Sequence, residues 1–165
     1  MIRQAEGKDF DDILRIYARA REYMKHGGNP TQWGENFPPE ALINDDIREK
    51  RNYVVESDGN VHGVFAFIPG ADPTYAHIEG AWKSDAPYGT IHRIASDGEV
   101  KGIFAAAIAF CKSRISHLRI DTHADNKTMR HAIEKAGFKK CGIIRVADGT
   151  PRIAYELMPA KAELC

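Results

Sequence analysis

The sequence predicts a mixed α/β (α+β) domain built on a largely antiparallel sheet, and three patterns predict it. Segments 52–57 and 61–69 alternate in polarity and are joined by "SDGN", which is typical of a β-hairpin. A strand, a helix and a strand over 89–121 indicate one parallel, right-handed crossover within the sheet. Two strands at the end of the chain are joined by "ADGT". At 165 residues, 43% of them hydrophobic, we expect a single domain over residues 1–165.

The chain begins with a predicted edge strand, "MIRQA", and two predicted helices. Asp9 has the residue type of a helix N-cap, and apolar residues at helical spacing follow it: Phe10, Ile13, Tyr17, Ala20 and Met24. "HGGNP" ends this helix, and a loop with the aromatic residues Trp33 and Phe37 leads to a second helix over 39–49. The aromatic loop either lines a binding site or plugs the core.

The later elements follow from the same two periodicities. After an ambiguous stretch over 70–88, "GTIHRIAS" predicts a strand, a helix is expected over about 102–114, and "HLRIDTH" predicts the next strand. Asp125 is an N-cap candidate for the following helix, and Gly137 suits a left-handed residue at its end. "FKKCGIIRV" and "RIAYELM" form the final hairpin, whose exposed edge could pair with a second subunit in a homodimer.

Charge and composition argue against several classes of protein. With 23 basic and 23 acidic side chains, the net charge attracts neither nucleic acid nor an anionic membrane, so we expect neither as a partner. The longest charge-free apolar run, 102–111, is far shorter than the roughly 20 residues of a spanning helix. Because the N-terminus lacks a secretory core and the three cysteines lack metal spacing, we expect a cytoplasmic protein. The seven histidines form no ligand motif, so we expect no metal.

The stretch "EVKGIF", residues 99–104, predicts a phosphate-binding loop. A helix N-terminus presents unpaired N–H groups and a partial positive charge, and Gly102 permits close approach of a ligand. The residues expected to bind are Val100, Lys101, Gly102, Ile103 and Phe104. Glu99 opposes an anion here, and Phe104 is bulky. Because every helix has such an end, the alternative is an ordinary helix start.

A second motif, "DTHADNKTMRHAIEKAGFKK", places Asn126 at a helix start and ends in a Gly137–Phe138 turn. With "TIHRIASDGEVKGIFAAAIAFC", it resembles the GNAT superfamily of N-acetyltransferases, and the resemblance extends through "IRQAEGKDFDDILRIYARAREYM" and "GNVHGVFAF". More narrowly, "DPTYAHIEGAWKSDAPYGTIHRIA" is similar to a bacterial subgroup whose substrates are mostly unassigned. The resemblance implies the GNAT fold and transfer of acetyl from acetyl-CoA to a primary amine of a small molecule, amino acid or peptide. It also implies direct attack in a ternary complex.

The resemblance further implies which residues bind acetyl-CoA. The family loop has Gln or Arg, then a central Gly, then Gly or Ala, and these positions fall on Glu99, Gly102 and Phe104, so only Gly102 matches. The backbones of Ile94 and Ala95 are expected to bond the pantetheine arm as an added strand would. Their strand and "LRIDT" are expected to splay around the thioester, and Asn126 matches a family Asn near the cofactor.

The catalytic residues are less constrained. The family's usual acid, a Tyr in the helix before the Gly–Phe turn, is replaced by Ile133. The remaining catalytic candidates are His92, His123 and Tyr155, and each is alternatively a hydrogen-bonded strand residue. The carboxylates Glu79 and Asp121 rank lower, and attack without a side-chain base is also open.

The acceptor is expected to contact Trp33, Glu79 and Tyr88. Glu99, Phe104 and Ile133 also leave open a second function, in which the fold is a catalytically weak or inactive CoA-binding or interaction module.

Overall fold

A computed structural model describes residues 1–160, which fold as two compact units. Unit 1 contains residues 1–67 and 92–110, and unit 2 contains residues 68–91 and the chain from Cys111 onward. Within the described residues, no helix combines the length and the apolar character needed to cross a membrane.

Unit 1 carries the first two helices and most of the first hairpin. Its elements are β1 (Ile2–Gln4), the 3₁₀ turn η1 (Gly7–Asp9), α1 (Phe10–His26), α2 (Glu40–Arg48), β2 (Asn52–Ser57), most of β3 (Asn60–Pro69), the second part of β5 (Gly89–Ser96) and most of α3 (Ile103–Lys112). The β2–β3 turn places Asp58 and Gly59 at φ values of 51° and 78°, which is the type I′ geometry that an Asp-Gly pair favours.

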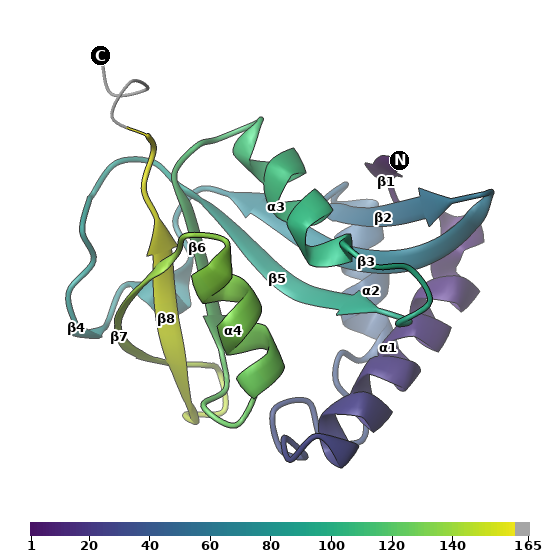
Figure 1. The fold of residues 1–165 in the computed structure, drawn as a ribbon, viewed down its shortest axis with the longest axis horizontal. Coiled ribbons are helices and arrows are strands. Elements are labelled where there is room, and N and C mark those ends of the chain that lie inside the picture. The colour runs from purple at the N-terminus through teal and green to yellow at the C-terminus, as the bar shows by residue number, and fades with distance from the viewer. Residues whose placement is uncertain (161–165) are drawn as a thin grey trace. The chain divides into compact units, whose positions relative to one another are not determined.

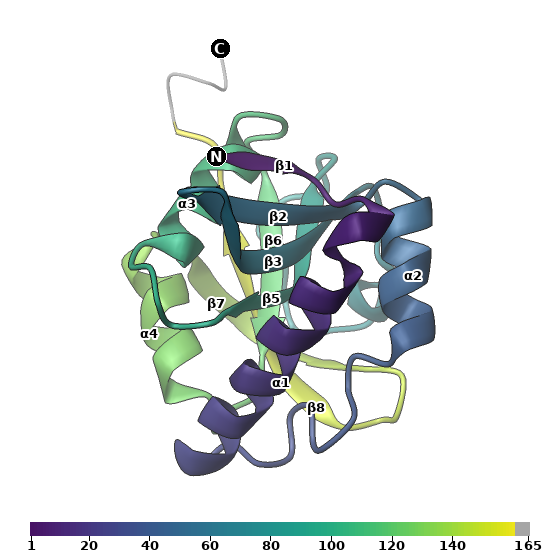
Figure 2. The same cartoon turned by 90° about the vertical axis from the view of Figure 1, so that its right-hand side faces the viewer.

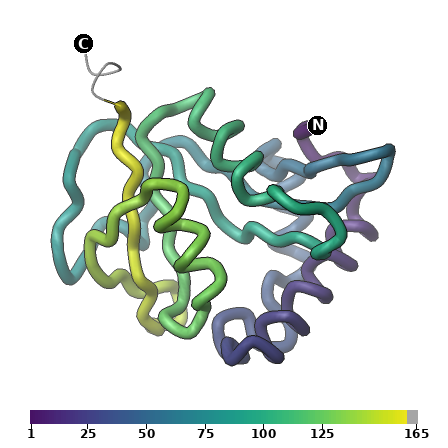
Figure 3. Tube along the Cα trace, viewed as in Figure 1, coloured from purple at the N-terminus to yellow at the C-terminus, as the bar shows by residue number. Residues whose placement is uncertain are grey.

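Unit 2 contains the final hairpin and the second half of the crossover. Its elements are the 3₁₀ turn η2 (Pro73–Tyr75), β4 (Glu79–Gly80), the start of β5, β6 (Leu118–Thr122), α4 (Lys127–Lys135), β7 (Lys139–Arg145) and β8 (Pro151–Leu157). The β7–β8 hairpin follows the turn at "ADGT" and can be traced in Figure 3. The short strand β4 lies in the stretch that was ambiguous in sequence, and it pairs with β7.

Strand hydrogen bonding gives the order β1-β2-β3-β5-β6-β8-β7-β4 (Figure 1). β5 and β6 are parallel, with Gly89 opposite Leu118 and Thr90 opposite Arg119. The registers of β1–β2, β2–β3, β6–β8, β7–β8 and β4–β7 are antiparallel. The structure therefore confirms the predicted mixed α/β class and its parallel pair.

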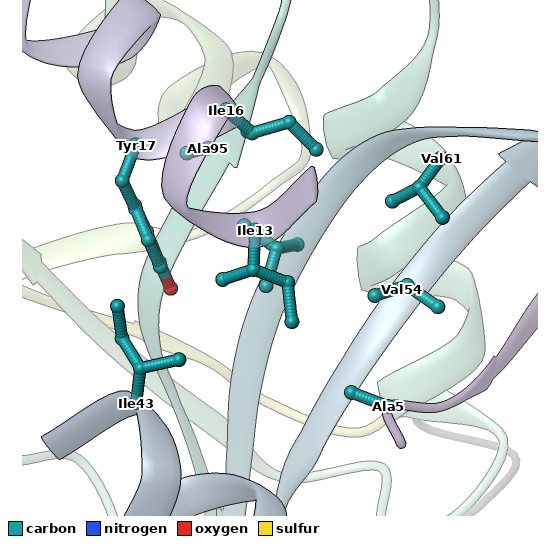
Figure 4. Packing of buried hydrophobic residues seen from close by; sticks show 9 residues of the cluster. Ala5, Ile13, Ile16, Tyr17, Ile43, Val54, Val61 and Ala95 are labelled. Atoms are coloured by element: carbon teal, nitrogen blue, oxygen red, sulfur yellow. The ribbon is translucent and has the colours of Figure 1, made fainter. Parts of the chain in front are cut away.

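The core of unit 1 forms where α1 and α2 cover one face of the strands (Figure 2). Its buried residues, drawn as sticks and most of them labelled in Figure 4, are Ala5, Ile13, Ile16, Tyr17, Ile43, Val54, Val61, Val64 and Ala95. Asp9 precedes α1 as predicted, but its carboxylate makes no cap bond to this helix. It accepts instead from the amide of Glu6 at 2.8 Å and from the guanidinium of Arg3 at 2.8 and 2.9 Å.

α3 packs on the other face of β3, and a glycine makes room for it. Gly63 pairs with Val55, and a Cβ at Gly63 would lie 2.6 Å from Ile103 Cγ2 and 3.3 Å from the Val55 side chain. Ile103 is the first residue of α3 and is buried. The absence of a side chain at position 63 therefore lets the start of α3 sit directly on the strand.

A buried carboxylate organises unit 2. Glu156 of β8 is 0% exposed and accepts hydrogen bonds from the Lys83 amide at 2.7 Å, His117 Nε2 at 2.7 Å and Arg119 Nε at 3.0 Å. Burial raises the pKa of Glu156, but these three donors outweigh it, so the pKa lies below its ordinary value. Lys83 lies in the β4–β5 connection, whereas His117 and Arg119 lie just before and within β6. The carboxylate therefore joins β8 to both of these segments.

The Arg119 guanidinium is stacked as well as paired. It lies 4.0 Å from the ring centroids of both Trp82 and Tyr88, and Nη2 donates to the Ser84 carbonyl at 2.7 Å. Cation–π contacts of this kind stabilise a partly desolvated Arg. The β4–β5 connection is thereby held against β6.

Enlarging Gly63 should destabilise the packing of α3. We expect Gly63→Ala to lower the free energy of unfolding by about 1–3 kcal/mol, because the added methyl overlaps Ile103. Gly7→Ala is the matched control: no atom lies within 4 Å of its added Cβ, so its effect should stay within about 0.5 kcal/mol. Denaturant unfolding measures both variants. Equal stabilities would show that α3 accommodates the methyl without cost.

Removing the Glu156 charge should be costly at neutral pH. Glu156→Gln leaves His117 and Arg119 without their carboxylate, so we expect a loss of about 3–5 kcal/mol. The folded pKa lies below the unfolded value of about 4.3, so this contribution is complete above that pH and is lost as the pH falls. Unfolding curves at pH 7 and pH 3 should therefore show a gap between variant and wild type that narrows on acidification.

The matched control for this variant is Glu35→Gln, which removes a 73% exposed carboxylate paired with Lys25. We expect it to change stability by less than about 1 kcal/mol. A Glu156→Gln protein as stable as wild type at pH 7 would contradict a stabilising role for the buried network.

Candidate functional site

In unit 1, β5 leads into a loop over residues 97–102 whose shape is set by its own side chains. Asp97 Oδ1 accepts the Glu99 amide at 2.9 Å, and Ser96 Oγ accepts the Gly98 amide at 3.0 Å. The Asp97 amide donates to the His62 carbonyl on β3 at 3.0 Å. Side-chain bonds of this kind fold a loop without a partner strand. The loop therefore reaches the start of α3 in a defined conformation.

Asp97 is itself fixed by two side chains from elsewhere in unit 1. Its side chain is 1% exposed, and Oδ2 lies 2.9 Å from His62 Nδ1 and 3.3 Å from Arg15 Nη1. Burial alone would raise the pKa of Asp97. Hydrogen bonds from the Glu99 amide, His62 and Arg15 have the larger, opposite effect, so the pKa lies below its ordinary value. No sequence pattern pointed to His62 or Arg15, although Asp-Gly after a strand is a turn signal.

Gly102 connects the loop to α3. It has a φ of 81°, and its carbonyl accepts the Ala106 amide at 3.0 Å, so the helical hydrogen bonds start at this residue. The next amides, those of Ile103 and Phe104, then have no acceptor within the helix and point out of its N-terminal end. Lys101 and Gly102 are exposed. This arrangement can bind an anion such as a phosphate group.

Two residues of the stretch 99–104 differ from those of a simple phosphate site: Glu99 in the loop and Phe104 in α3. Glu99 forms an ion pair with Arg19 of α1 at 3.0 Å, with side chains 57% and 53% exposed. Phe104 is half-buried, whereas Ile103 and Ala107 lie in the core. The negative charge of Glu99 is thus partly neutralised by a helix 80 residues away in sequence, which no local pattern indicated.

The end of β5 and the aromatic loop also lie in unit 1. His92 and Ile94 are half-buried, and Ala95 is buried in the core beside α1. Trp33 is half-buried, with its ring 5.5 Å from that of Tyr17 in an edge-to-face contact and 6.4 Å from that of Phe37. Trp33 therefore packs against the core, while Phe37 stays 40% exposed.

In unit 2, His123 and Asn126 lie just before the start of α4. Asn126, not Asp125, is the N-cap, because its Oδ1 accepts the Met129 amide at 3.1 Å. His123 Nδ1 accepts the Asp125 amide at 3.0 Å, so the neutral ring carries its proton on Nε2. In this tautomer His123 presents a hydrogen-bond donor rather than a base at its outer nitrogen.

The remaining catalytic candidate, Tyr155, points from β8 to α4. It is 0% exposed and donates to Glu134 Oε1 at 3.4 Å. Burial is the main cause of its raised pKa, so the side chain stays a protonated phenol at neutral pH. Ile133, at the position of the family's usual acid, is fully buried and belongs to the interior of unit 2.

The expected acceptor residues of unit 2 lie in different environments. Tyr88 is buried, its hydroxyl accepts the Asp72 amide at 2.8 Å, and its ring packs against Arg119. Glu79 is exposed and lies 3.5 Å from Arg145.

Tyr75 and Asp121 form a hydrogen-bonded pair that the sequence did not indicate. The Tyr75 hydroxyl donates to Asp121 Oδ2 at 2.7 Å, and burial raises the pKa of Tyr75 well above its usual range. Tyr75 is therefore a phenol donor that orients a half-buried carboxylate on β6.

The described residues contain no group of three His, Cys, Asp or Glu side chains that could hold a metal ion. Cys111 is buried and Cys141 half-buried, both as free thiols, and burial raises the pKa of Cys111 to about 12. Cys165 lies outside the described residues.

Known structures share this fold over nearly the whole chain. A GNAT-family acetyltransferase from Streptococcus agalactiae is 32% identical, with a TM-score of 0.84 and coverage of 98% of this chain and 96% of that chain. One from Listeria monocytogenes is 20% identical, with a TM-score of 0.67 and coverage of 95% and 94%. The ribosomal-protein-S18-alanine N-acetyltransferase from Escherichia coli is 18% identical, with a TM-score of 0.62 and coverage of 98% and 96%.

The second and third likenesses support the fold alone. No protein-family model and no curated protein matches the chain. The first likeness combines near-complete coverage with identity over about a third of the positions. On this evidence the chain belongs to the GNAT family of acetyltransferases.

Proposed function

We propose that this protein transfers acetyl from acetyl-CoA to the primary amine of a small molecule, an amino acid or a peptide. The observation that supports this most directly is the loop over residues 97–102, which Asp97 fixes and which ends at Gly102 with the free amides of α3. In a GNAT-family chain, a preformed anion-binding loop directly after β5 suits the pyrophosphate of an acyl-CoA.

Unit 1 supplies the groups we assign to acetyl-CoA. The amides of Ile103 and Phe104, with Lys101 as a nearby cation, would hold the pyrophosphate without needing a particular side chain at position 99. The peptide groups of Ile94 and Ala95 would bond the pantetheine arm as an added strand does. Backbone recognition of this kind tolerates Glu99, since its charge is shared with Arg19.

The reaction requires three proton movements. The neutral amine nitrogen attacks the thioester carbonyl, a C–N bond forms and the C–S bond breaks. The nitrogen gives up one N–H proton to become the amide, and CoA leaves as a thiolate that takes up a proton. Before attack, the ammonium form must lose a proton to a side chain or to water. Among the candidates, His92 keeps the role of base, whereas His123, in the tautomer that its bond to the Asp125 amide implies, and Tyr155 as a phenol suit the role of donor.

The proposal is tested by binding and turnover of the wild-type protein. Acetyl-CoA at about 100 times its dissociation constant should stabilise the fold by about 2.7 kcal/mol, seen as a higher melting temperature. Release of CoA thiol should depend on an added amine when a panel of small amines, amino acids and peptides is offered. Binding without turnover for any acceptor would favour the inactive CoA-binding module, and absence of both would refute the proposal.

The charge at position 99 should tune affinity for acetyl-CoA. We expect Glu99→Gln to lower the dissociation constant about two- to fivefold at low salt, because a screened repulsion is removed and Arg19 is released. The gain should shrink in 0.5 M salt, at a Debye length of roughly 4 Å. Titration calorimetry measures both conditions.

Glu35→Gln is again the matched control, since it also removes one exposed, paired carboxylate from unit 1 but at the aromatic loop. Its acetyl-CoA affinity should equal that of wild type. Unchanged or weaker binding by Glu99→Gln would show that Glu99 does not face the bound anion.

A further inference from the structure

Arg93 has an unusual backbone conformation for a strand residue. Among the described residues, the non-glycine positions with positive φ are Lys50, Asp58 and Arg93, and only Arg93, at 51°, lies inside a strand. The left-handed region is disfavoured for any residue with a Cβ. Such a conformation persists only when surrounding contacts impose it, and it often marks a functional position.

Two contacts within unit 1 hold Arg93 in place. Asp46 of α2 accepts Arg93 Nε at 2.9 Å through Oδ2 and Nη2 at 3.0 Å through Oδ1, and its side chain is 1% exposed. From α1, the Tyr17 hydroxyl donates to the Arg93 carbonyl at 2.8 Å. A two-point bond to a buried carboxylate fixes the side chain, and the tyrosine fixes the direction of the carbonyl.

Tyr17 is in turn held by packing. Its ring is 1% exposed, lies in edge-to-face contact with Trp33, and extends from α1 toward Ile43 of α2 (Figure 4). Burial raises the pKa of Tyr17, so its hydroxyl remains a donor at neutral pH. The hydroxyl therefore has one position, and the Arg93 carbonyl is directed to it.

A left-handed residue changes the direction of the peptide groups that follow it, and here these belong to Ile94 and Ala95. We propose that Asp46 and Tyr17 are positioning residues, which keep Arg93 left-handed so that the Ile94 and Ala95 backbone is presented to acyl-CoA. This inference rests on the proposed function. It gives a functional role to the buried ion pair between Asp46 of α2 and Arg93 of β5.

The alternative is that Asp46 only stabilises the fold. A variant of Arg51 distinguishes this stabilising role from the proposed positioning role. Arg51 Nε also lies 2.6 Å from Asp46 Oδ1, but Arg51 precedes β2 and has no part in β5. Arg51→Gln therefore removes a guanidinium from the same carboxylate while leaving the bond to Arg93. It is the matched control for losing a buried ion-pair partner.

The first measurement is acetyl-CoA affinity, by calorimetry, at a temperature where each variant is folded. Without its partner, Arg93 spends most of its time outside the left-handed region, and apparent affinity falls with the competent fraction. We expect Asp46→Asn to raise the dissociation constant about tenfold, and Arg51→Gln to change it less than about twofold. Tyr17→Phe, which retains the buried ring, should weaken binding in the same direction and decides the question if Asp46→Asn does not fold.

The second measurement asks whether Arg93→Gly removes the effect of Asp46→Asn on acetyl-CoA affinity. Glycine adopts left-handed conformations without penalty, so an Arg93→Gly protein does not need Asp46 to hold the backbone. In that background, Asp46→Asn should change affinity by less than about twofold, which appears as strong coupling in a double-mutant cycle. A purely stabilising ion pair would not produce this rescue of binding.

The outcomes distinguish this inference from the proposed function. If wild type does not bind acetyl-CoA, the proposed function fails and this inference fails with it. If wild type binds, and folded Asp46→Asn and Tyr17→Phe bind equally well, the inference alone is overturned. It is also overturned if Asp46→Asn weakens binding to the same extent with glycine at position 93.

Discussion

A buried carboxylate must have its full set of donors, and in this protein that requirement joins segments far apart in sequence. Asp46 connects α2 to β5, Asp97 connects the loop after β5 to α1 and β3, and Glu156 connects β8 to β6 and the β4–β5 connection. Each is 0–5% exposed and each accepts from at least two other residues. The hydrophobic layers bring the elements together, and these carboxylates set the conformation of the segments between them.

The N-terminal end of α3, where we propose that acyl-CoA binds, depends on one of these carboxylates. Asp97 shapes the loop from inside, so the amides after Gly102 are oriented without help from the side chain at position 99. That explains how a GNAT-family chain can carry Glu99 at this position. Its charge is paired with Arg19, and under the proposed function the backbone amides and the helix dipole would recognise the anion. A poor match to a sequence motif is therefore compatible with a well-formed loop.

Burial also gives three tyrosines a common chemical state. Tyr17, Tyr75 and Tyr155 all have raised pKa values because they are desolvated, and each hydroxyl donates to a specific oxygen: the Arg93 carbonyl, Asp121 or Glu134. None of them is suited to act as a base at neutral pH. They orient backbone and carboxylate groups instead. Under the proposed function, histidine or water would therefore take the proton from the acceptor amine.

The sequence by itself determined most of the elements, the two hairpins and the parallel pair, because hydrophobic periodicity and turn chemistry are local properties that neighbouring residues fix. It left residues 70–88, with η2 and β4, ambiguous. It also located the loop at Gly102, through the strand before it and the helix after it. Only the tertiary structure decided the partners: Arg19 with Glu99, His62 with Asp97, and Asp46 with Arg93, 80, 35 and 47 residues apart. It likewise decided the left-handed Arg93. Such pairings depend on which side chains are desolvated together, and that is known only when the chain has folded.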